Sequence, residues 1–157
     1  MAYNYGKQFE DLVKKQFCEV QGAVIERLYD NTAGFHGINN ICDFIGYIYP
    51  NIFFLEVKVV QSGNTFPLDR LTQYEKLLEK SGVPGVRSGV VIWFMEKQKI
   101  VYVPVTTFKK LHDDGKKSVN IKYLEGNEYR LIEIPSTPKR VFMRSDYSVL
   151  KNLQDND

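Results

Sequence analysis

One stretch of the sequence limits the possible folds more than any other, the apolar run Ile-Phe-Phe-Leu-Glu-Val-Lys-Val-Val at residues 52–60. Its β-branched and aromatic residues predict a β-strand. The alternation of side chains along a strand places Glu56 and Lys58 on one face and only apolar residues, Leu55, Val57 and Val59, on the other. Burying a carboxylate and an ammonium group is costly unless a partner or a metal ion compensates. This strand is therefore expected to carry a functional site.

A second run of strand-forming residues, 41–49, precedes the first and is separated from it by Pro50-Asn51. The pair predicts a β-hairpin. Asp43 lies early in the first strand, so antiparallel pairing would bring it towards Glu56, close enough for both carboxylates to share a divalent cation. Hard oxygen ligands favour Mg²⁺, with Mn²⁺ as a substitute. The alternative is that Glu56 and Lys58 form a solvated ion pair on an edge strand.

The remaining apolar patterns predict helices alternating with strands. Helices are expected at residues 4–21, from about 71 to 82, and from a capping Thr106 to 115, and strands at 23–28, 89–95, 100–105 and 128–134. A glycine-containing loop is expected at residues 30–37 and a mixed tail after residue 134. This order indicates an α/β fold in which helices flank a mixed central β-sheet.

The length and composition are those of a soluble globular protein. A chain of 157 residues is expected to form one domain, 1–157, with 151–157 as a frayed tail. No apolar run is long enough to cross a bilayer, and the N-terminus does not resemble a signal peptide, so a cytoplasmic protein without a membrane role is expected. Cys18 and Cys42 lack metal-binding spacing and are expected to be reduced and partly buried.

The net charge of +2 is too small to indicate a nucleic-acid partner, so any DNA-binding surface must come from local clusters. The clearest basic cluster consists of Lys139, Arg140 and Arg144. Its residues suit phosphate contacts, although a solvated tail is the alternative. Arg27, beside the glycine-containing loop, is a further DNA-contact candidate, unless it pairs with Glu26 or Asp30.

The chain resembles the PD-(D/E)xK nuclease superfamily and, within it, the RecU-type Holliday junction resolvases of Gram-positive bacteria and their phages. The resemblance covers roughly residues 6–95 and is carried by Gly6-Lys7-Gln8-Phe9-Glu10, Arg27-Leu28-Tyr29-Asp30, Cys42-Asp43-Phe44, Glu56-Val57-Lys58, Phe66-Pro67-Leu68 and Gln73. Asp43 with Glu56-x-Lys58 is typical of the superfamily, whereas Phe66-Pro67-Leu68 and Gln73 point to the RecU type.

The resemblance implies a restriction-endonuclease-like core and a role for each of these residues. Asp43, Glu56 and the Val57 carbonyl would bind Mg²⁺, and Lys58 would support the attacking water or the charge of the transition state. Glu10, as a further metal ligand, and Gln73 would complete the catalytic site. On sequence grounds alone, Glu10 and Gln73 could equally be exposed helix residues.

The expected function is a structure-specific, metal-dependent endonuclease that resolves four-way DNA junctions by paired symmetric nicks in recombination and repair. Because such a junction has approximate two-fold symmetry, a homodimer is expected, with host recombination proteins as further partners. The family carries a protruding stalk before its metal-binding aspartate, but residues 34–40 leave room only for a short loop. This difference puts stalk-based junction selectivity in doubt and suggests a phage product in a bacterial cell. The alternatives are another nuclease of the superfamily and a non-catalytic nucleic-acid-binding module.

Overall fold

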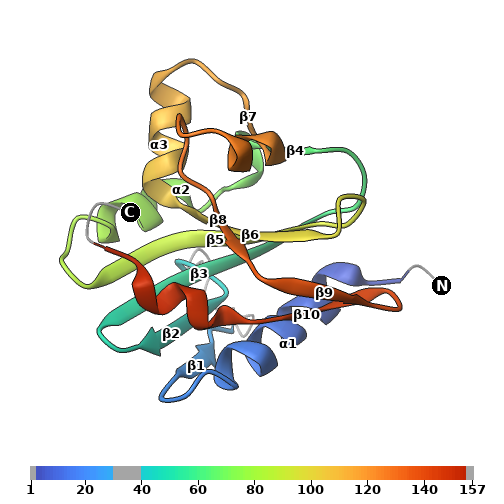
Figure 1. Cartoon of the computed structure of the whole chain (residues 1–157). Helices are drawn as coiled ribbons and strands as arrows, with labels where there is room; N and C mark the ends of the chain where they lie inside the picture. The colour runs from blue at the N-terminus through green and yellow to red at the C-terminus, as the bar shows by residue number, and fades with distance from the viewer. Residues whose placement is uncertain (1–2, 30–39, 155–157) are drawn as a thin grey trace, which may run out of the picture.

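A six-stranded mixed β-sheet forms the centre of the molecule in the computed structural model, which describes residues 3–29 and 40–154 (Figure 1). Its strands, in spatial order, are β1 (Val24–Arg27), β2 (Phe44–Ile48), β3 (Asn51–Val60), β5 (Val86–Phe94), β6 (Lys99–Pro104) and β8 (Ile132–Ile134). The pairing of β3 with β5 is parallel, and the other neighbours are antiparallel. The predicted hairpin of β2 and β3 is confirmed.

Helices and small ribbons cover both faces of this sheet (Figure 1). One face carries α1 (Tyr5–Cys18), the hairpin of β9 (Ser136–Lys139) and β10 (Phe142–Ser145), and the 3-10 helix η3 (Tyr147–Asn152). The other carries α2 (Tyr74–Lys80), α3 (Val105–Asp113), the ribbon of β4 (Thr65–Pro67) and β7 (Ser118–Asn120), and the 3-10 helices η1 (Leu68–Arg70) and η2 (Ile121–Glu125). The prediction of an α/β fold with helices flanking a mixed sheet is confirmed.

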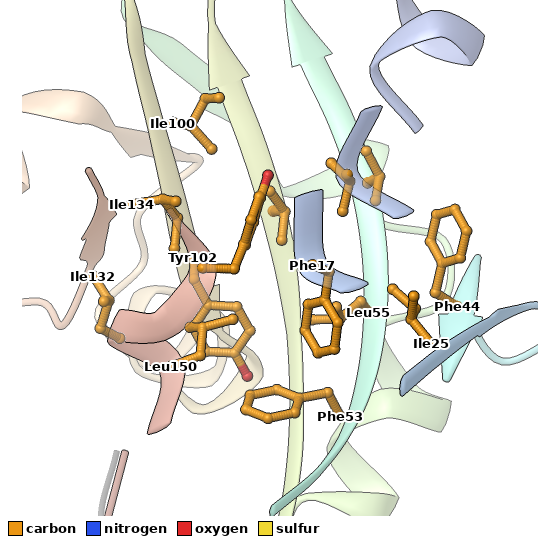
Figure 2. Close-up of a cluster of buried hydrophobic side chains, with 14 of the residues drawn as sticks. Phe17, Ile25, Phe44, Phe53, Leu55, Ile100, Tyr102, Ile132, Ile134 and Leu150 are labelled. Atoms are coloured by element: carbon orange, nitrogen blue, oxygen red, sulfur yellow. The ribbon is translucent and has the colours of Figure 1, made fainter. Parts of the chain in front are cut away.

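The alternation along β3 divides its side chains between two hydrophobic clusters. Leu55 and Val57 are buried in the cluster under α1, whereas Val60 belongs to the cluster under α2 and α3. Figure 2 shows the first cluster, in which Phe17 of α1 packs edge-on against Phe53 with 5.9 Å between ring centroids. The prediction that Leu55 and Val57 face away from Glu56 is therefore confirmed.

The C-terminal hairpin is fixed to α1 by a buried amide. Gln16 donates from Nε2 to the Met143 carbonyl at 3.3 Å, and its Oε1 accepts from the Ser145 N–H at 3.2 Å. These bonds satisfy two backbone groups of β10 that would otherwise be buried without partners. The hairpin therefore keeps a defined position along α1.

The tail differs from its prediction. The expected frayed segment at 151–157 is wrong for 151–154, because η3 continues to Asn152 and Leu153 is buried against the sheet. The Arg87 guanidinium donates to the backbone carbonyls of Leu153, at 3.4 Å, and Gln154, at 2.6 Å. This contact could not be predicted from local sequence pattern, because Arg87 is 66 and 67 positions away from these two residues along the chain.

Several element boundaries also differ from the predicted ones. The third helix begins at Val105, directly after Pro104 at the end of β6, so Thr106 does not cap it. The first strand of the hairpin begins at Phe44, which leaves Asp43 just outside it. The predicted loop at 30–37 lies outside the described residues. Among the described residues, no helix is both long and apolar enough to cross a membrane.

Gly89 provides a test of the packing between β5 and β6. A Cβ atom at this position would lie 2.6 Å from the ring of Tyr102, which is itself buried. We expect Gly89→Ala to lower the free energy of unfolding by about 1–3 kcal/mol through overpacking. Gly82→Ala is the control, because no atom lies within 4 Å of its added Cβ. Urea unfolding should show a loss for the first variant only, and equal stabilities would contradict this packing.

Candidate active site

Asp43 lies at the edge of β3 because β3 extends beyond the beginning of β2. The register pairs Phe44 with Leu55, so the residues of β3 after Leu55 have no partner in β2. The Asp43 N–H donates to the Leu55 carbonyl at 3.1 Å, and Asp43 Oδ2 accepts from the Val57 N–H at 2.8 Å. A carboxylate thus replaces the missing strand and is held beside Glu56 by the same bonds.

Glu56 is a buried acid, only 3% exposed. Its Oε1 lies 3.6 Å from Lys58 Nζ, whereas its Oε2 is buried and has no hydrogen-bond partner among the described residues. Burial raises the pKa of Glu56 to about 8, with a further rise from the negative charge of Asp43 and a partial offset from Lys58. The unpartnered Oε2 gives Glu56 the capacity to bind a cation in addition to the Lys58 ammonium group.

Two further groups of β3 complete this edge. Lys58 is partly buried, with 23% of its side chain exposed, so its ammonium group reaches solvent while staying near Glu56. In a strand, the N–H and C=O of one residue point to the same side. Because the Val57 N–H is bonded to Asp43, the Val57 carbonyl is directed to the same edge. The predicted residues Asp43, Glu56, Val57 and Lys58 are therefore brought together.

A divalent cation is compatible with this pair of carboxylates. Asp43 and Glu56 supply the hard oxygen ligands that Mg²⁺ and Mn²⁺ prefer, and the partnerless Oε2 of Glu56 is a buried acceptor that a cation would satisfy. Within residues 3–29 and 40–154, no group of three or more His, Cys, Asp or Glu side chains is placed to hold a metal ion. The compatibility therefore depends on two carboxylates and the nearby backbone carbonyl.

Glu10, predicted as a further ligand, is held by another residue in this structure. It lies on α1 and forms an ion pair with Arg27 of β1, whose second contact is Asp11 at 3.6 Å. Burial raises the pKa of Glu10, Arg27 lowers it, and the charge of Asp43 raises it. Glu10 thus lies within electrostatic range of Asp43 but is bonded to Arg27, and its role as a metal ligand stays a prediction.

Arg27 was expected either to contact DNA or to pair with Glu26 or Asp30. Among the described residues, which do not include Asp30, it contacts Glu10 and Asp11, and its guanidinium lies 5.4 Å from the ring centre of Phe44. The pairing of Arg27 with Glu10 was hard to predict from the sequence, because it depends on the packing of α1 across β1. Its assignment as a DNA contact remains a prediction.

Gln73 is not part of a helix but precedes α2 as its N-cap residue. Its Oε1 accepts from the Thr72 hydroxyl at 3.1 Å. No described contact links Gln73 to Asp43, Glu56 or Lys58, so its catalytic role stays a prediction.

The structure divides the predicted basic cluster. Arg144, on β10, forms an ion pair with Glu19 at 2.6 Å, whereas Lys139 and Arg140 lie at the turn of the β9–β10 hairpin.

The expectation that both cysteines are partly buried is wrong for Cys18, which is exposed. Cys42 is buried, donates to the Phe44 carbonyl at 3.1 Å, and has a pKa raised to about 12, mainly by burial.

Comparison with known proteins finds similarity among solved structures. No family model and no curated protein matches the chain. Among solved structures, the chain is similar to Hjc from Archaeoglobus fulgidus, a Holliday junction resolvase from an archaeal hyperthermophile. The identity is 17%, the TM-score is 0.42, and the match covers 64% of this chain and 76% of that one. This likeness is too weak to transfer an activity.

The raised pKa of Glu56 predicts how the stability of the metal-free protein depends on pH. An unfolded glutamate ionises near its usual pKa of 4.5, whereas Glu56 stays protonated up to about 8. The favourable contribution of Glu56 to the free energy of unfolding is therefore fully present below pH 4.5 and is lost as the pH rises towards 8.

Glu56→Gln should remove this dependence, because the amide is neutral throughout. At pH 8 we expect the variant to exceed the wild type in stability by more than about 1 kcal/mol, since one pKa unit corresponds to about 1.4 kcal/mol. Urea unfolding in EDTA at several pH values measures the difference, with Glu79→Gln on the exposed side of α2 as the control. Parallel pH profiles for the wild type and Glu56→Gln would contradict the assignment.

Proposed function

We propose that this protein is a metal-dependent DNA endonuclease whose active centre consists of Asp43, Glu56 and Lys58. The observation that carries the proposal is the buried Oε2 of Glu56, which has no hydrogen-bond partner among the described residues and lies beside a second carboxylate. A purely structural ion pair would have no need for such an acceptor, because leaving it unsatisfied destabilises the fold. Raised carboxyl pKa values of this kind are frequent at functional sites.

The proposed roles follow from the chemistry of each group. Asp43, Glu56 and the Val57 carbonyl would hold Mg²⁺, which Mn²⁺ could replace. When bound, the cation would supply Lewis acidity for activating water and for neutralising charge on the phosphate. Asp43 is fixed by the Val57 N–H, so its carboxylate is pre-positioned before substrate arrives. The Lys58 ammonium would orient the attacking water or stabilise the negative charge that develops on the phosphoryl oxygens.

The groups around this centre have supporting roles in the proposal. If the Arg27 guanidinium bound a DNA phosphate instead of Glu10, the Glu10 carboxylate would be released and would join the acidic centre. Gln73, which is only half-buried before α2, would contact the substrate or the attacking water. Lys139, Arg140 and Arg144 would contact the DNA backbone.

Four-way junctions are the proposed substrate, and the support is the sequence resemblance through Phe66-Pro67-Leu68 and Gln73 as well as Asp43 and Glu56-x-Lys58. Resolution requires two symmetric nicks, so the active form would be an isologous homodimer. Such an enzyme would act in recombination and repair in the bacterial cytoplasm, as a bacterial or phage product, with host recombination proteins as partners.

Cleavage of a labelled synthetic four-way junction beside a linear duplex of the same arms tests the proposal. We expect paired symmetric nicks on the junction with Mg²⁺ and none with EDTA. Asp43→Asn should reduce the rate by at least about 100-fold, because it removes a charged ligand from the metal site. Asp113→Asn, on the exposed face of α3, is the matched control and should cut like the wild type.

The other outcomes separate the alternatives. Equal cutting of the linear duplex would indicate another nuclease of the superfamily. Tight junction binding without Mg²⁺-dependent cutting would indicate a binding module and would overturn the enzymatic proposal. Unchanged cutting by Asp43→Asn would overturn the assignment of the active centre.

A further inference from the structure

The turn of the β9–β10 hairpin combines cationic and apolar side chains on an exposed tip. Lys139 pairs with Phe142, so Arg140 and Val141 form a two-residue turn. Lys139 and Arg140 are exposed, Val141 is 51% exposed, and Tyr3 beside the turn is 52% exposed. Together with Phe142, these residues line a pocket of about 460 Å³. We call this group, Tyr3 and residues 139–142, the hairpin tip.

The hairpin tip lies at the same end of the molecule as the candidate active site. The register of the parallel strands sets Val59, next to Lys58, beside Trp93. Trp93 packs on both Phe142 of the tip and Phe9 of α1, with ring centroids 5.4 Å and 5.3 Å apart. Figure 1 shows the β9–β10 turn near the N-terminal end of α1. The tip therefore lies at the Lys58 end of the sheet on the α1 face, whereas the Glu56 and Lys58 side chains alternate to the other face.

The charges of the hairpin tip are not neutralised within the described part of the chain. Neither Lys139 nor Arg140 forms an ion pair there, and no acidic residue lines the pocket beside them. Arg144 of the same hairpin, by contrast, is paired with Glu19, and Arg27 is paired with Glu10. Among the predicted DNA-contact residues, these two cations alone remain available to a ligand without breaking a described ion pair.

Arg140 occupies a backbone position that favours glycine. Its φ is 47°, in the left-handed region, which is strained for a residue with a Cβ. Two-residue hairpin turns with a positive φ at this position usually carry glycine, asparagine or aspartate. An arginine here costs stability, so the strain points to a role for its side chain beyond folding.

The aromatic part of the tip offers a stacking surface. Tyr3 packs against Tyr5 with 4.6 Å between ring centroids and stays half exposed. Exposed aromatic side chains next to cations are typical of surfaces that bind unpaired nucleotides, because every base has a face that can stack. Apolar side chains at a projecting tip can also insert at opened base steps.

We propose that the hairpin tip binds the branch point of the DNA substrate, with Lys139 and Arg140 on the phosphate backbone and Tyr3 and Val141 against an unstacked base. This inference depends on the proposed nuclease function for its substrate class, and it assigns recognition of DNA structure to a surface separate from Asp43, Glu56 and Lys58. Gln16 holds β10 on α1, so the tip is presented at a fixed distance from the active centre.

The first test measures the charge contribution with the full-length protein in EDTA, where binding can be followed without cleavage. Lys139→Ala with Arg140→Ala should weaken binding of a fluorescent four-way junction at least fivefold, and the slope of log K against log salt should become shallower by about 1 per cation removed. Lys80→Ala with Lys151→Ala is the matched control, because it removes two exposed cations at the end of the sheet where β5 begins, away from Lys58 and the hairpin tip. Equal losses for both pairs, or no loss for the first, would overturn the proposal.

The second test separates binding from folding. Arg140→Gly should melt at the same or a higher temperature than the wild type, because glycine adopts a positive φ without strain, and yet it should bind the junction more weakly. Tyr3→Ala with Val141→Ser should lose about five- to 150-fold in junction affinity, the range for one base stacked on an aromatic ring. Linear duplex, which offers no unstacked base, should be bound by this variant as by the wild type. Unchanged junction affinity in either variant would overturn the corresponding contact.

These binding outcomes are independent of cleavage. If the wild type binds junctions but does not cut them, the proposed nuclease function fails, while the effects of the tip variants still decide the present inference. If the wild type cuts junctions and the tip variants bind them normally, the inference alone fails. Absence of any DNA binding by the wild type would overturn both.

Discussion

The burial of the Glu56 carboxyl group is the constraint on which this end of the structure depends. β3 continues past the beginning of β2, so its edge needs polar partners that a neighbouring strand would otherwise supply. Asp43 supplies one of them by accepting the Val57 N–H at 2.8 Å. The same bond brings a second acid to Glu56, whose buried Oε2 has no hydrogen-bond partner among the described residues. One local difference in strand length thus places two carboxylates at the edge of an otherwise apolar sheet.

The ion pairs around this edge divide the basic residues into two classes. Arg27 and Arg144 are neutralised by acids of α1, namely Glu10 and Glu19, and so help to fix α1 against β1 and β10. The exposed Arg144–Glu19 pair adds little to stability, but both pairs neutralise a positive charge. Lys139 and Arg140 keep their charge at the end of the molecule that carries Glu56. A cationic tip beside an acidic, metal-compatible centre suits a polyanionic substrate, whose backbone the tip could hold while the centre acts on one phosphate.

Much of the sheet was predictable because its signals are local. The apolar alternation of residues 52–60 predicted both the strand and the separation of Glu56 from Leu55, and Pro50-Asn51 located the hairpin. The short β4, β7, β9 and β10 were not predicted, since three or four residues carry too little pattern to distinguish a strand from a loop. The helix start at Val105 was missed because Thr106 has the chemistry of a cap, whereas the continuous run from β6 into α3 depends on how both pack on the sheet.

The sequence by itself determined the mixed sheet, the flanking helices and the meeting of Asp43 with Glu56 and Lys58, because these follow from periodicity and from pairing across a short turn. The tertiary structure alone decided that Glu10 meets Arg27 and that Arg87 holds the chain at Leu153. It also decided that Arg144 is paired, whereas the hairpin tip has no ion pair among the described residues. Each of these contacts joins residues that are distant along the chain. Their formation depends on how helices and hairpins dock on the sheet, and docking is set by the complementary shapes of buried side chains rather than by local sequence pattern.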